Sequence, residues 1–304
     1  MSESVKERIR TKALELGASH IGFSQANPIQ DHEKLLRWLS KGHAQNMSYM
    51  SEPGRVEKRH DPKKLWPAVQ SILCASFSYK PKIDEHASPL KFGRYAWGED
   101  YHLFVKRRLF DLLSWMQSSL DASIQGRVFV DTAPVLERSL ARQAGLGWIG
   151  KNTCLMSQQH GSYLYLGEIF LSHPFAPDRP VTDHCGTCTA CLDACPTQAF
   201  EGPYQLDSEK CISYQTLENR DQDLPSWMKG NTQDWIAGCD ICQEVCPWNH
   251  KAPASTLPEI APKPFVALHA SDFQTMTSEE FDQQFSGTTL LRTGLEKMKK
   301  NLPS

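Results

Sequence analysis

The residues with the clearest chemistry are cysteines, and eight of the ten in this chain lie between residues 184 and 250. The first run, from Cys185 to Pro196, has the spacing C-x2-C-x2-C-x3-C-P. The second run, from Cys239 to Pro247, repeats this spacing but lacks the first cysteine. Cysteines at every third residue turn several thiolates toward one iron–sulfur cubane, and the C-P dipeptide ends the loop. The spacing therefore predicts that the region binds two [4Fe-4S] clusters.

The two runs and one isolated cysteine supply two sets of four thiolates. In two-cluster ferredoxins the fourth cysteine of each run ligates the other cluster. Ile236 stands where the missing cysteine of the second run would fall, so Cys211 is the nearest candidate for the last ligand. The predicted ligands are Cys185, Cys188, Cys191 and Cys246 for the first cluster, and Cys195, Cys211, Cys239 and Cys242 for the second.

Two other uses of these cysteines are weaker. Zinc also accepts four thiolates, but zinc sites usually bring cysteines as separate pairs rather than as a run of four that ends in proline. Disulfides need an oxidising compartment. The N-terminal residues are charged and lack the apolar core of a signal peptide, and no stretch approaches the ~20 apolar residues of a membrane span. We therefore expect a cytoplasmic protein without a membrane segment.

The length and the charge of the chain limit the number of domains and the kinds of partner that it can have. A chain of 304 residues with 40% hydrophobic residues is long enough for two domains and a tail around a sizeable core. The formal charge of -2 provides no overall attraction to nucleic acid, so an RNA contact would need a local basic patch. Candidate patches contain Arg55, Lys58 and Arg59, and Lys106 to Arg108, although a solvated loop and a solvated helix face explain the same charges.

The part before residue 178 alternates helical and strand patterns, which argues for a mixed α/β domain. Expected helices cover residues 2–16, 31–39, 102–120 and 134–143, and expected strands cover 19–23, 71–77, 127–131 and 162–172. Residues 53–62 are expected to form a polar loop. Three prolines between Pro174 and Pro180 mark a boundary. We expect a catalytic domain over 1–178, a ferredoxin-like domain over 179–250, and an extension over 251–304 that is first irregular and then helical.

Asp131 is the best candidate for acid–base chemistry. It ends an apolar strand just before a helix, where α/β folds place ligands and catalytic groups. Partial burial would raise its pKa and keep the carboxyl protonated, ready to donate. The alternative is that Asp131 caps the helix that opens at Pro134. The glycine-rich stretch 145–153 offers backbone N–H groups to a phosphate but fits no dinucleotide or Walker fingerprint, and Cys74 and Cys154 are expected to pack rather than react.

An α/β domain joined to a two-cluster electron-transfer module indicates a reductase. Four segments, residues 94–102, 130–138, 147–153 and 210–214, resemble epoxyqueuosine reductases. The most specific motifs are D-T-A-P-x-L-E-R and G-W-I-G-K-N, and the resemblance extends from about residue 5 to 250. It implies a cobalamin- and iron–sulfur-dependent enzyme that removes the epoxide oxygen of epoxyqueuosine at the wobble position of tRNA, giving queuosine.

The resemblance also implies a fold and site residues. The fold class is α+β, with a mixed α/β cobalamin-binding catalytic domain, similar to that of reductive dehalogenases, followed by a ferredoxin-like domain with two clusters. The family's proton donor falls on Asp131. The sequence Asp100-Tyr-His102 lacks the glycine of the D-x-H-x-x-G cobalamin motif, which agrees with base-off cobalamin without a histidine ligand. The corrinoid-lining segments of the family contain Arg55, Trp97, Asp131, Lys151 and Ser213.

The partners implied by the resemblance are tRNA carrying epoxyqueuosine and an external electron donor of the flavodoxin or ferredoxin type, and we expect a monomer. Many family members continue into a helical-repeat domain that helps to bind tRNA, and residues 292–301 look like the start of that region. Two other functions remain open. A corrinoid reductive dehalogenase would usually carry a twin-arginine signal, which is missing here. A plain ferredoxin-type electron carrier would not need the long stretch before Cys185.

Overall fold

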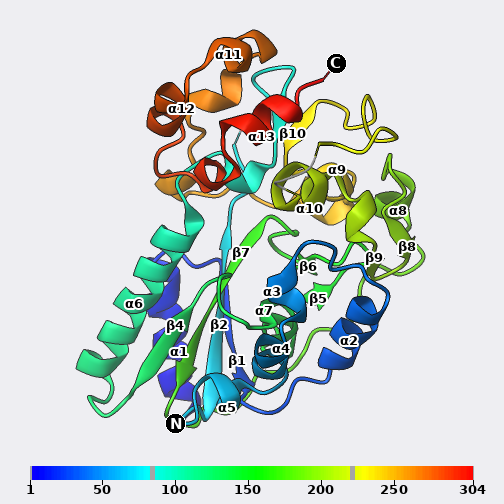
Figure 1. Cartoon of the computed structure of the whole chain (residues 1–304). Helices are drawn as coiled ribbons and strands as arrows, with labels where there is room; N and C mark the ends of the chain where they lie inside the picture. The colour runs from blue at the N-terminus through cyan, green and yellow to red at the C-terminus, as the bar shows by residue number, and fades with distance from the viewer. Residues whose placement is uncertain (1, 83–85, 220–222, 304) are drawn as a thin grey trace.

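The computed structural model describes residues 2–82, 86–219 and 223–303, and it is built around a four-stranded sheet (Figure 1). The strand order is β1 (His20–Gln25), β2 (Ser71–Ser78), β7 (Leu164–Leu171) and β4 (Gly126–Phe129). All neighbouring strands in this sheet run antiparallel. The predicted α+β class is confirmed. The sheet that precedes Asp131 thus differs from the mostly parallel sheets of the α/β folds to which its position was compared.

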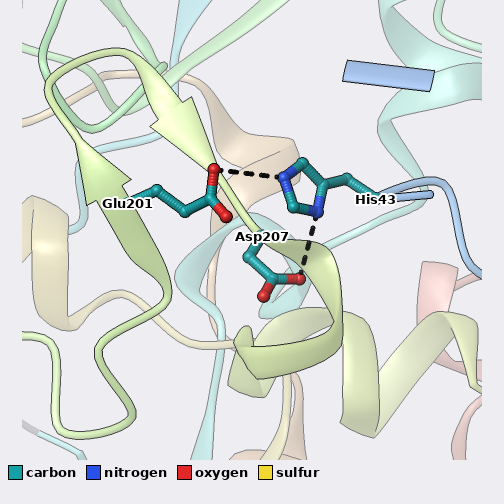
Figure 2. Close-up of side chains that lie close together, drawn as sticks. All are labelled: His43, Glu201 and Asp207. Atoms are coloured by element: carbon teal, nitrogen blue, oxygen red, sulfur yellow. Dashed lines mark ion pairs between the residues drawn. The ribbon is translucent and has the colours of Figure 1, made fainter. Parts of the chain in front are cut away.

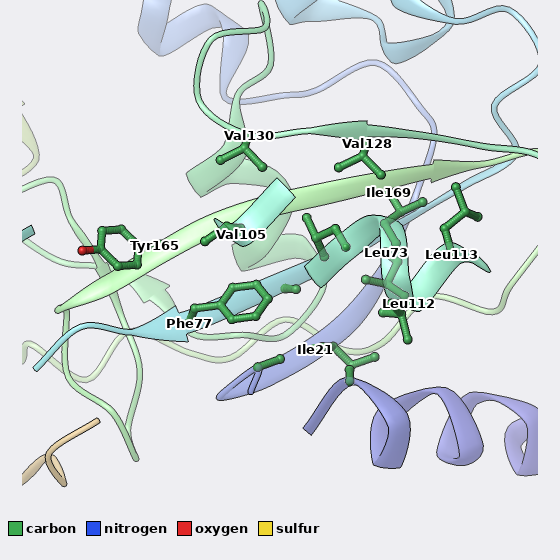
Figure 3. Close-up of a cluster of buried hydrophobic side chains, with 14 of the residues drawn as sticks. Ile21, Leu73, Phe77, Val105, Leu112, Leu113, Val128, Val130, Tyr165 and Ile169 are labelled. Atoms are coloured by element: carbon green, nitrogen blue, oxygen red, sulfur yellow. The ribbon is translucent and has the colours of Figure 1, made fainter. Parts of the chain in front are cut away.

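Helices cover both faces of the sheet: α1 (Glu3–Glu15) and α6 (Tyr101–Ser119) on one face, and α7 (Glu137–Gln143) on the other. Because successive side chains of a strand point to opposite faces, β2 contributes to two cores. Leu73 and Phe77 pack under α6 (Figure 3), whereas Ile72 and Cys74 pack under α7. This double coverage explains why β2 is buried along its whole length, and it confirms that Cys74 is a core residue.

Four short helices separate β1 from β2: α2 (His32–Ser40), α3 (Ser48–Ser51), α4 (Pro53–His60) and α5 (Pro62–Leu65). The polar loop expected over residues 53–62 is therefore wrong. Proline suits the first turn of a helix, and basic residues suit the last turn, where they face the negative end of the helix dipole. Arg59 is buried, and its Nη1 donates a hydrogen bond to the backbone oxygen of Tyr49 at 3.0 Å. Arg59 therefore has a structural role and does not belong to the candidate RNA patch.

The cysteine-rich part contains short elements only, which leaves its loops free to place thiols. These elements are α8 (Ala190–Asp193), β8 (Phe200–Gly202), β9 (Gln205–Leu206), β10 (Trp235–Ala237), α9 (Ile241–Glu244) and α10 (Pro247–Lys251). β10 pairs in parallel with β3 (Lys91–Phe92), and β5 (Trp148–Ile149) pairs with β6 (Leu155–Met156). The cysteine-rich part is therefore joined to the first part by backbone pairing as well as by the chain.

Within residues 252–303 the structure has three α-helices: α11 (Ala270–Thr275), α12 (Ser278–Gln284) and α13 (Leu295–Lys300). In Figure 1, α11 and α12 are drawn in orange and α13 in red, and α13 lies beside β10. Their apolar side chains form a second core with residues 90–97 and with Ile236 and Ala237. Trp97 lies in this core with 3% of its surface exposed, and its indole N–H donates to the backbone oxygen of Phe92 at 2.8 Å. Within the described ranges, no helix combines the length and apolar character needed to cross a membrane.

A histidine bridge fastens the segment after α2 to the β8–β9 hairpin (Figure 2). His43 Nε2 lies 3.3 Å from Glu201 Oε2, and His43 Nδ1 lies 3.4 Å from Asp207 Oδ1. Lys41 Nζ also contacts Glu201 Oε2, at 2.7 Å. Because the two carboxylates face different ring nitrogens, the arrangement is that of an ion-pair bridge, and it ties the first part of the chain to the cysteine-rich part.

Arg108, proposed above for an RNA patch, instead joins α6 to the segment after the cysteines. Its Nη2 lies 2.7 Å and 2.9 Å from the two carboxylate oxygens of Glu259, and its Nη1 donates to the backbone oxygen of Leu16. The Glu259 side chain is only 10% exposed. Arg107 approaches the same carboxylate at 3.5 Å but remains 60% exposed.

We predict that Arg108→Met lowers the free energy of unfolding by about 2–3 kcal/mol, because it leaves a nearly buried carboxylate without its main partner. Thermal unfolding followed by circular dichroism measures the change. Lys106→Ala, two residues away on an exposed part of the same helix, is the matched control and should change the free energy by no more than about 0.5 kcal/mol. Equal melting temperatures for the two variants would contradict the structural role of Arg108.

Candidate functional site

Asp131 lies in a tight turn that follows β4. Its backbone φ of 54° is in the left-handed region, which Asp and Asn tolerate better than most residues. Its amide donates a hydrogen bond to Glu137 Oε1 at 2.5 Å. The helix expected from Pro134 begins only at Glu137, and its N-cap residue is Leu136. The interpretation of Asp131 as a helix cap is therefore wrong, and its side chain is free for another role.

The Asp131 carboxylate pairs with a histidine that the sequence analysis did not select. Asp131 Oδ2 lies 2.8 Å from His102 Nε2, while His102 Nδ1 lies 2.6 Å from Asp100 Oδ1. The Asp131 side chain is 51% exposed, whereas that of His102 is only 12% exposed. The signal for His102 was present, since Asp100-Tyr-His102 belongs to one of the segments that carry the family resemblance.

Two carboxylates around one imidazole decide where the proton resides. Burial lowers the pKa of His102, but its hydrogen bonds to Asp100 and Asp131 outweigh that effect and raise it to about 9. Burial acts to raise the pKa of Asp131, but the hydrogen bond and charge of His102 bring it below its usual value. The expectation of a raised pKa for Asp131 is therefore wrong, because that expectation took no account of a cationic partner. At neutral pH the pair is an imidazolium and a carboxylate that share one proton.

Two arginines flank the Asp131 turn. Arg55, on α4, donates from Nη2 to the backbone oxygen of Thr132 at 3.2 Å. Arg292, in the segment before α13, has its Nη2 3.3 Å from His102 Nδ1. Arg55 Nε also donates to the backbone oxygen of Tyr49 at 3.2 Å. Among the residues that the structure describes, the bonds of the two guanidinium groups are thus to backbone oxygens and to His102 rather than to a carboxylate, and their charge can act on a ligand that covers Asp131.

The other residues expected beside a corrinoid lie elsewhere. Lys151 Nζ donates to the backbone oxygens of Gly186 and Cys188 at 2.7 Å and 2.8 Å, so it holds the first cysteine loop. Ser213 is half-buried, two residues after Cys211. Trp97 packs in the core formed with the C-terminal helices, as described above. The structure thus brings Arg55 to Asp131, whereas it places Lys151 and Ser213 against the cysteines and Trp97 in a core.

The eight cysteines gather into two groups. Burial raises the pKa of Cys191 to about 11, and the thiols of Cys246, Cys185 and Cys188 add to that shift. Burial also raises the pKa of Cys239 and Cys242 well above the usual range. Cys211 contributes to both of these shifts, and Cys195 contributes to the first. The two neighbourhoods coincide with the two ligand sets expected from spacing.

The first group surrounds open space. A cavity of about 280 Å³ has walls that include Cys185, Cys188, Cys191 and Cys246, with Lys151, Trp248 and Lys251 at its margin. Four thiols around one cavity fit a cluster ligated by four thiolates. Cys188 is exposed, whereas burial raises the pKa of Cys211 in the second group. The first group is therefore the shallower of the two.

The glycine-rich stretch 145–153 supports both cysteine loops. Trp148 Nε1 donates to Cys185 Sγ at 3.4 Å, and Asn152 Nδ2 donates to the backbone oxygen of Cys242 at 3.2 Å. A Cβ at Gly147 would lie 1.9 Å from the backbone oxygen of Met156, so the close pairing of β5 with β6 requires glycine there. Amides of this stretch also bond within the turn that it forms, as from Thr153 to Gly150. The phosphate cradle considered above is replaced by a structural role beside the cysteines.

Comparisons with known proteins agree with this geometry. The family model described as a 4Fe-4S double cluster binding domain matches residues 184–249, and that described as epoxyqueuosine reductase QueG, DUF1730, matches residues 59–132. A curated epoxyqueuosine reductase of Leadbetterella byssophila is 40% identical over 97% of this chain and 96% of its own length.

Solved structures extend the comparison. An epoxyqueuosine reductase crystallised with an epoxyqueuosine-modified tRNA-Tyr stem loop superposes with a TM-score of 0.89 at 31% identity, covering 98% of this chain and 80% of that one. A catabolic reductive dehalogenase shares the fold at a TM-score of 0.50 and 15% identity, over 97% of this chain and 38% of its own. On the strength of the near full-length identity to curated relatives, this chain belongs to the epoxyqueuosine reductase family.

Proposed function

We propose that this chain removes the epoxide oxygen of epoxyqueuosine at the wobble position of tRNA, using cobalamin and two [4Fe-4S] clusters. The observation that carries the proposal is the Asp131–His102 pair, whose half-exposed carboxylate shares a proton with the imidazole and lies beside Arg55 and Arg292. Tyr95 is a partly buried ring on which charges from both this pair and the second cysteine run act. Burial raises the pKa of Tyr95, and both Asp240, next to Cys239, and Asp131 add to that shift.

The residues around Asp131 fit a corrinoid that lacks a histidine ligand. Both ring nitrogens of His102 are engaged, one by Asp100 and one by Asp131, so His102 is not free to ligate cobalt. The guanidinium groups of Arg55 and Arg292 suit the amide oxygens and the phosphate of cobalamin, or a phosphate of the RNA. When bound, cobalamin supplies reduced cobalt as the immediate source of electrons.

The protein's own contribution is the proton. Loss of an epoxide oxygen as water consumes two electrons and two protons, and a developing alkoxide is a poor leaving group until it is protonated. In this structure at neutral pH the proton is on His102, and Asp131 is a half-exposed carboxylate. Bound ligands that cover Asp131 remove its water, which disfavours the charged pair and moves the proton toward the carboxylate. Asp131 then donates this proton to the substrate oxygen, and the second proton comes from solvent, which reprotonates the pair through His102.

Electrons enter, on this proposal, through the shallower first cysteine group and leave through the second toward the Asp131 site. The donor is a flavodoxin- or ferredoxin-like protein that docks near exposed Cys188. A single chain holds both cysteine groups and the Asp131 site, so we propose that it acts as a monomer in the cytoplasm. The RNA contacts are assigned to Arg55, Arg292 and exposed Lys58, since Arg59 and Arg108 are engaged inside the protein.

A direct assay tests the function. Anaerobically purified protein with cobalamin and a strong reductant should convert epoxyqueuosine to queuosine in tRNA from a strain that lacks the activity. Nucleoside analysis by mass spectrometry measures both forms. A halogenated phenol without tRNA serves as the second substrate. If the halogenated phenol is dehalogenated while epoxyqueuosine stays unchanged, the result would favour the reductive dehalogenase alternative. If the purified protein binds no corrinoid, the result would favour the electron carrier.

We predict that Cys211→Ala loses roughly half of the bound iron, because one four-thiolate site is broken while the other stays intact. Iron and sulfide analysis of anaerobically purified protein measures the loss. Cys154→Ala is the matched control, since this thiol contributes to the pKa shift of Cys242 but is not an expected ligand. Full iron content in Cys211→Ala would remove Cys211 from the ligand set.

We predict that Asp131→Asn keeps both clusters and cobalamin but loses about 10²-fold or more in turnover, because an amide offers no comparably acidic proton. Asparagine also tolerates the left-handed backbone, so the turn should persist. Asp121→Asn is a matched control that removes a different exposed carboxylate paired with a histidine, His173. Wild-type turnover in Asp131→Asn would mean that the proton comes from elsewhere.

A further inference from the structure

A fully buried acid, unused by the mechanism above, lies behind the Asp131 turn. Glu168 is 0% exposed in the middle of β7, between Cys74 on β2 and Phe129 on β4. Among the described residues, no hydrogen-bond donor reaches either of its carboxylate oxygens. An unpaired buried carboxylate is very unfavourable, so Glu168 should carry a proton.

Glu137 acts on this acid. Burial raises the pKa of Glu168 well above its usual value, and the charges of Glu137 and Asp131 add to the shift. Burial likewise raises the pKa of Glu137 to about 8, with the Asp131 charge as the next cause.

The same Glu137 carboxyl controls the Asp131 backbone. Its Oε1 accepts the Asp131 amide hydrogen at 2.5 Å, which closes the turn from the end of β4 to the start of α7. A left-handed φ is unfavourable for a residue with a side chain, so the turn needs a compensating contact. From this backbone conformation the Asp131 carboxylate reaches His102 at 2.8 Å.

We propose that Glu137 is the positioning residue that holds Asp131 in its left-handed, His102-facing conformation. The expected effect of Glu137 on turnover rests on the proposed role of Asp131 as the proton donor. The geometry itself is independent of that role. Glu137 acts through its acceptor oxygen, so a side chain that retains an oxygen at the same distance should replace it.

Three variants test the proposal in the full chain with both clusters in place. Glu137→Gln keeps an acceptor oxygen, Glu137→Leu removes it, and Glu137→Asp shortens the side chain by one methylene. Hydrogen exchange with mass spectrometry on a peptide that contains Asp131 reports the amide hydrogen bond directly. We expect exchange in this peptide to accelerate about tenfold or more in Glu137→Leu and Glu137→Asp, and to change little in Glu137→Gln.

Turnover should follow the same order. We expect kcat to fall about tenfold or more in Glu137→Leu and Glu137→Asp, with the KM for tRNA unchanged, while Glu137→Gln stays within about threefold of wild type. Iron content controls for folding, and Glu137→Asp keeps the comparison available if Glu137→Leu does not fold.

Unchanged amide exchange in Glu137→Leu and Glu137→Asp would overturn the proposal. A Glu137→Gln variant as impaired as Glu137→Leu would also overturn it, because the carboxyl would then be needed as an acid rather than as an acceptor. Failure of the wild-type protein to reduce epoxyqueuosine would instead reject the proposed function, and the exchange measurement would still decide the role of Glu137.

Discussion

The hydrogen bond between Asp131 and His102 joins the parts of the chain on which the site depends. His102 lies in the first turn of α6, where Asp100 both caps the helix through the His102 amide and bonds the imidazole. The Asp100 amide in turn donates to Gly287 in the C-terminal segment at 2.8 Å. One helix N-terminus therefore connects the turn after β4, the imidazole and the C-terminal core. A displacement of any of these would alter the proton-bearing pair.

The iron–sulfur part and the catalytic part also share their supports. The stretch 145–153 belongs by sequence to the first part, yet its side chains hold both cysteine loops. Arg94, one residue before Tyr95, lies 3.3 Å from Asp240 within the second cysteine run. Because these contacts and the β3–β10 pairing join the two parts, the two parts cannot move independently without breaking them. Such rigidity suits electron transfer between fixed centres and a proton donor that must be aligned with them.

Several residues of ordinary surface type have internal roles. Arg59 and Arg108 bond backbone oxygens and a buried carboxylate instead of facing solvent, and Lys151 bonds the backbone of a cysteine loop. Long cationic side chains reach several carbonyl groups at once, which explains their use where short loops leave oxygens unpaired. The cations that remain open beside Asp131 are Arg55 and Arg292, which come from segments far apart in the sequence.

The sequence by itself determined the chemistry of the cysteines, since ligand spacing is local and a run of C-x2-C-x2-C-x3-C-P leaves few other uses for its thiols. It also determined β2 and α6, whose apolar patterns are continuous or periodic. Only the tertiary structure decided the protonation of Asp131, because His102 reaches it from another element and the hydrogen bond and charge of His102 oppose the effect of burial. The tertiary structure also decided the burial of Trp97, the ion pair of Arg108 and the residue at which α7 starts. In each case a tertiary contact or a strained turn had more effect than the residue types nearby in the sequence.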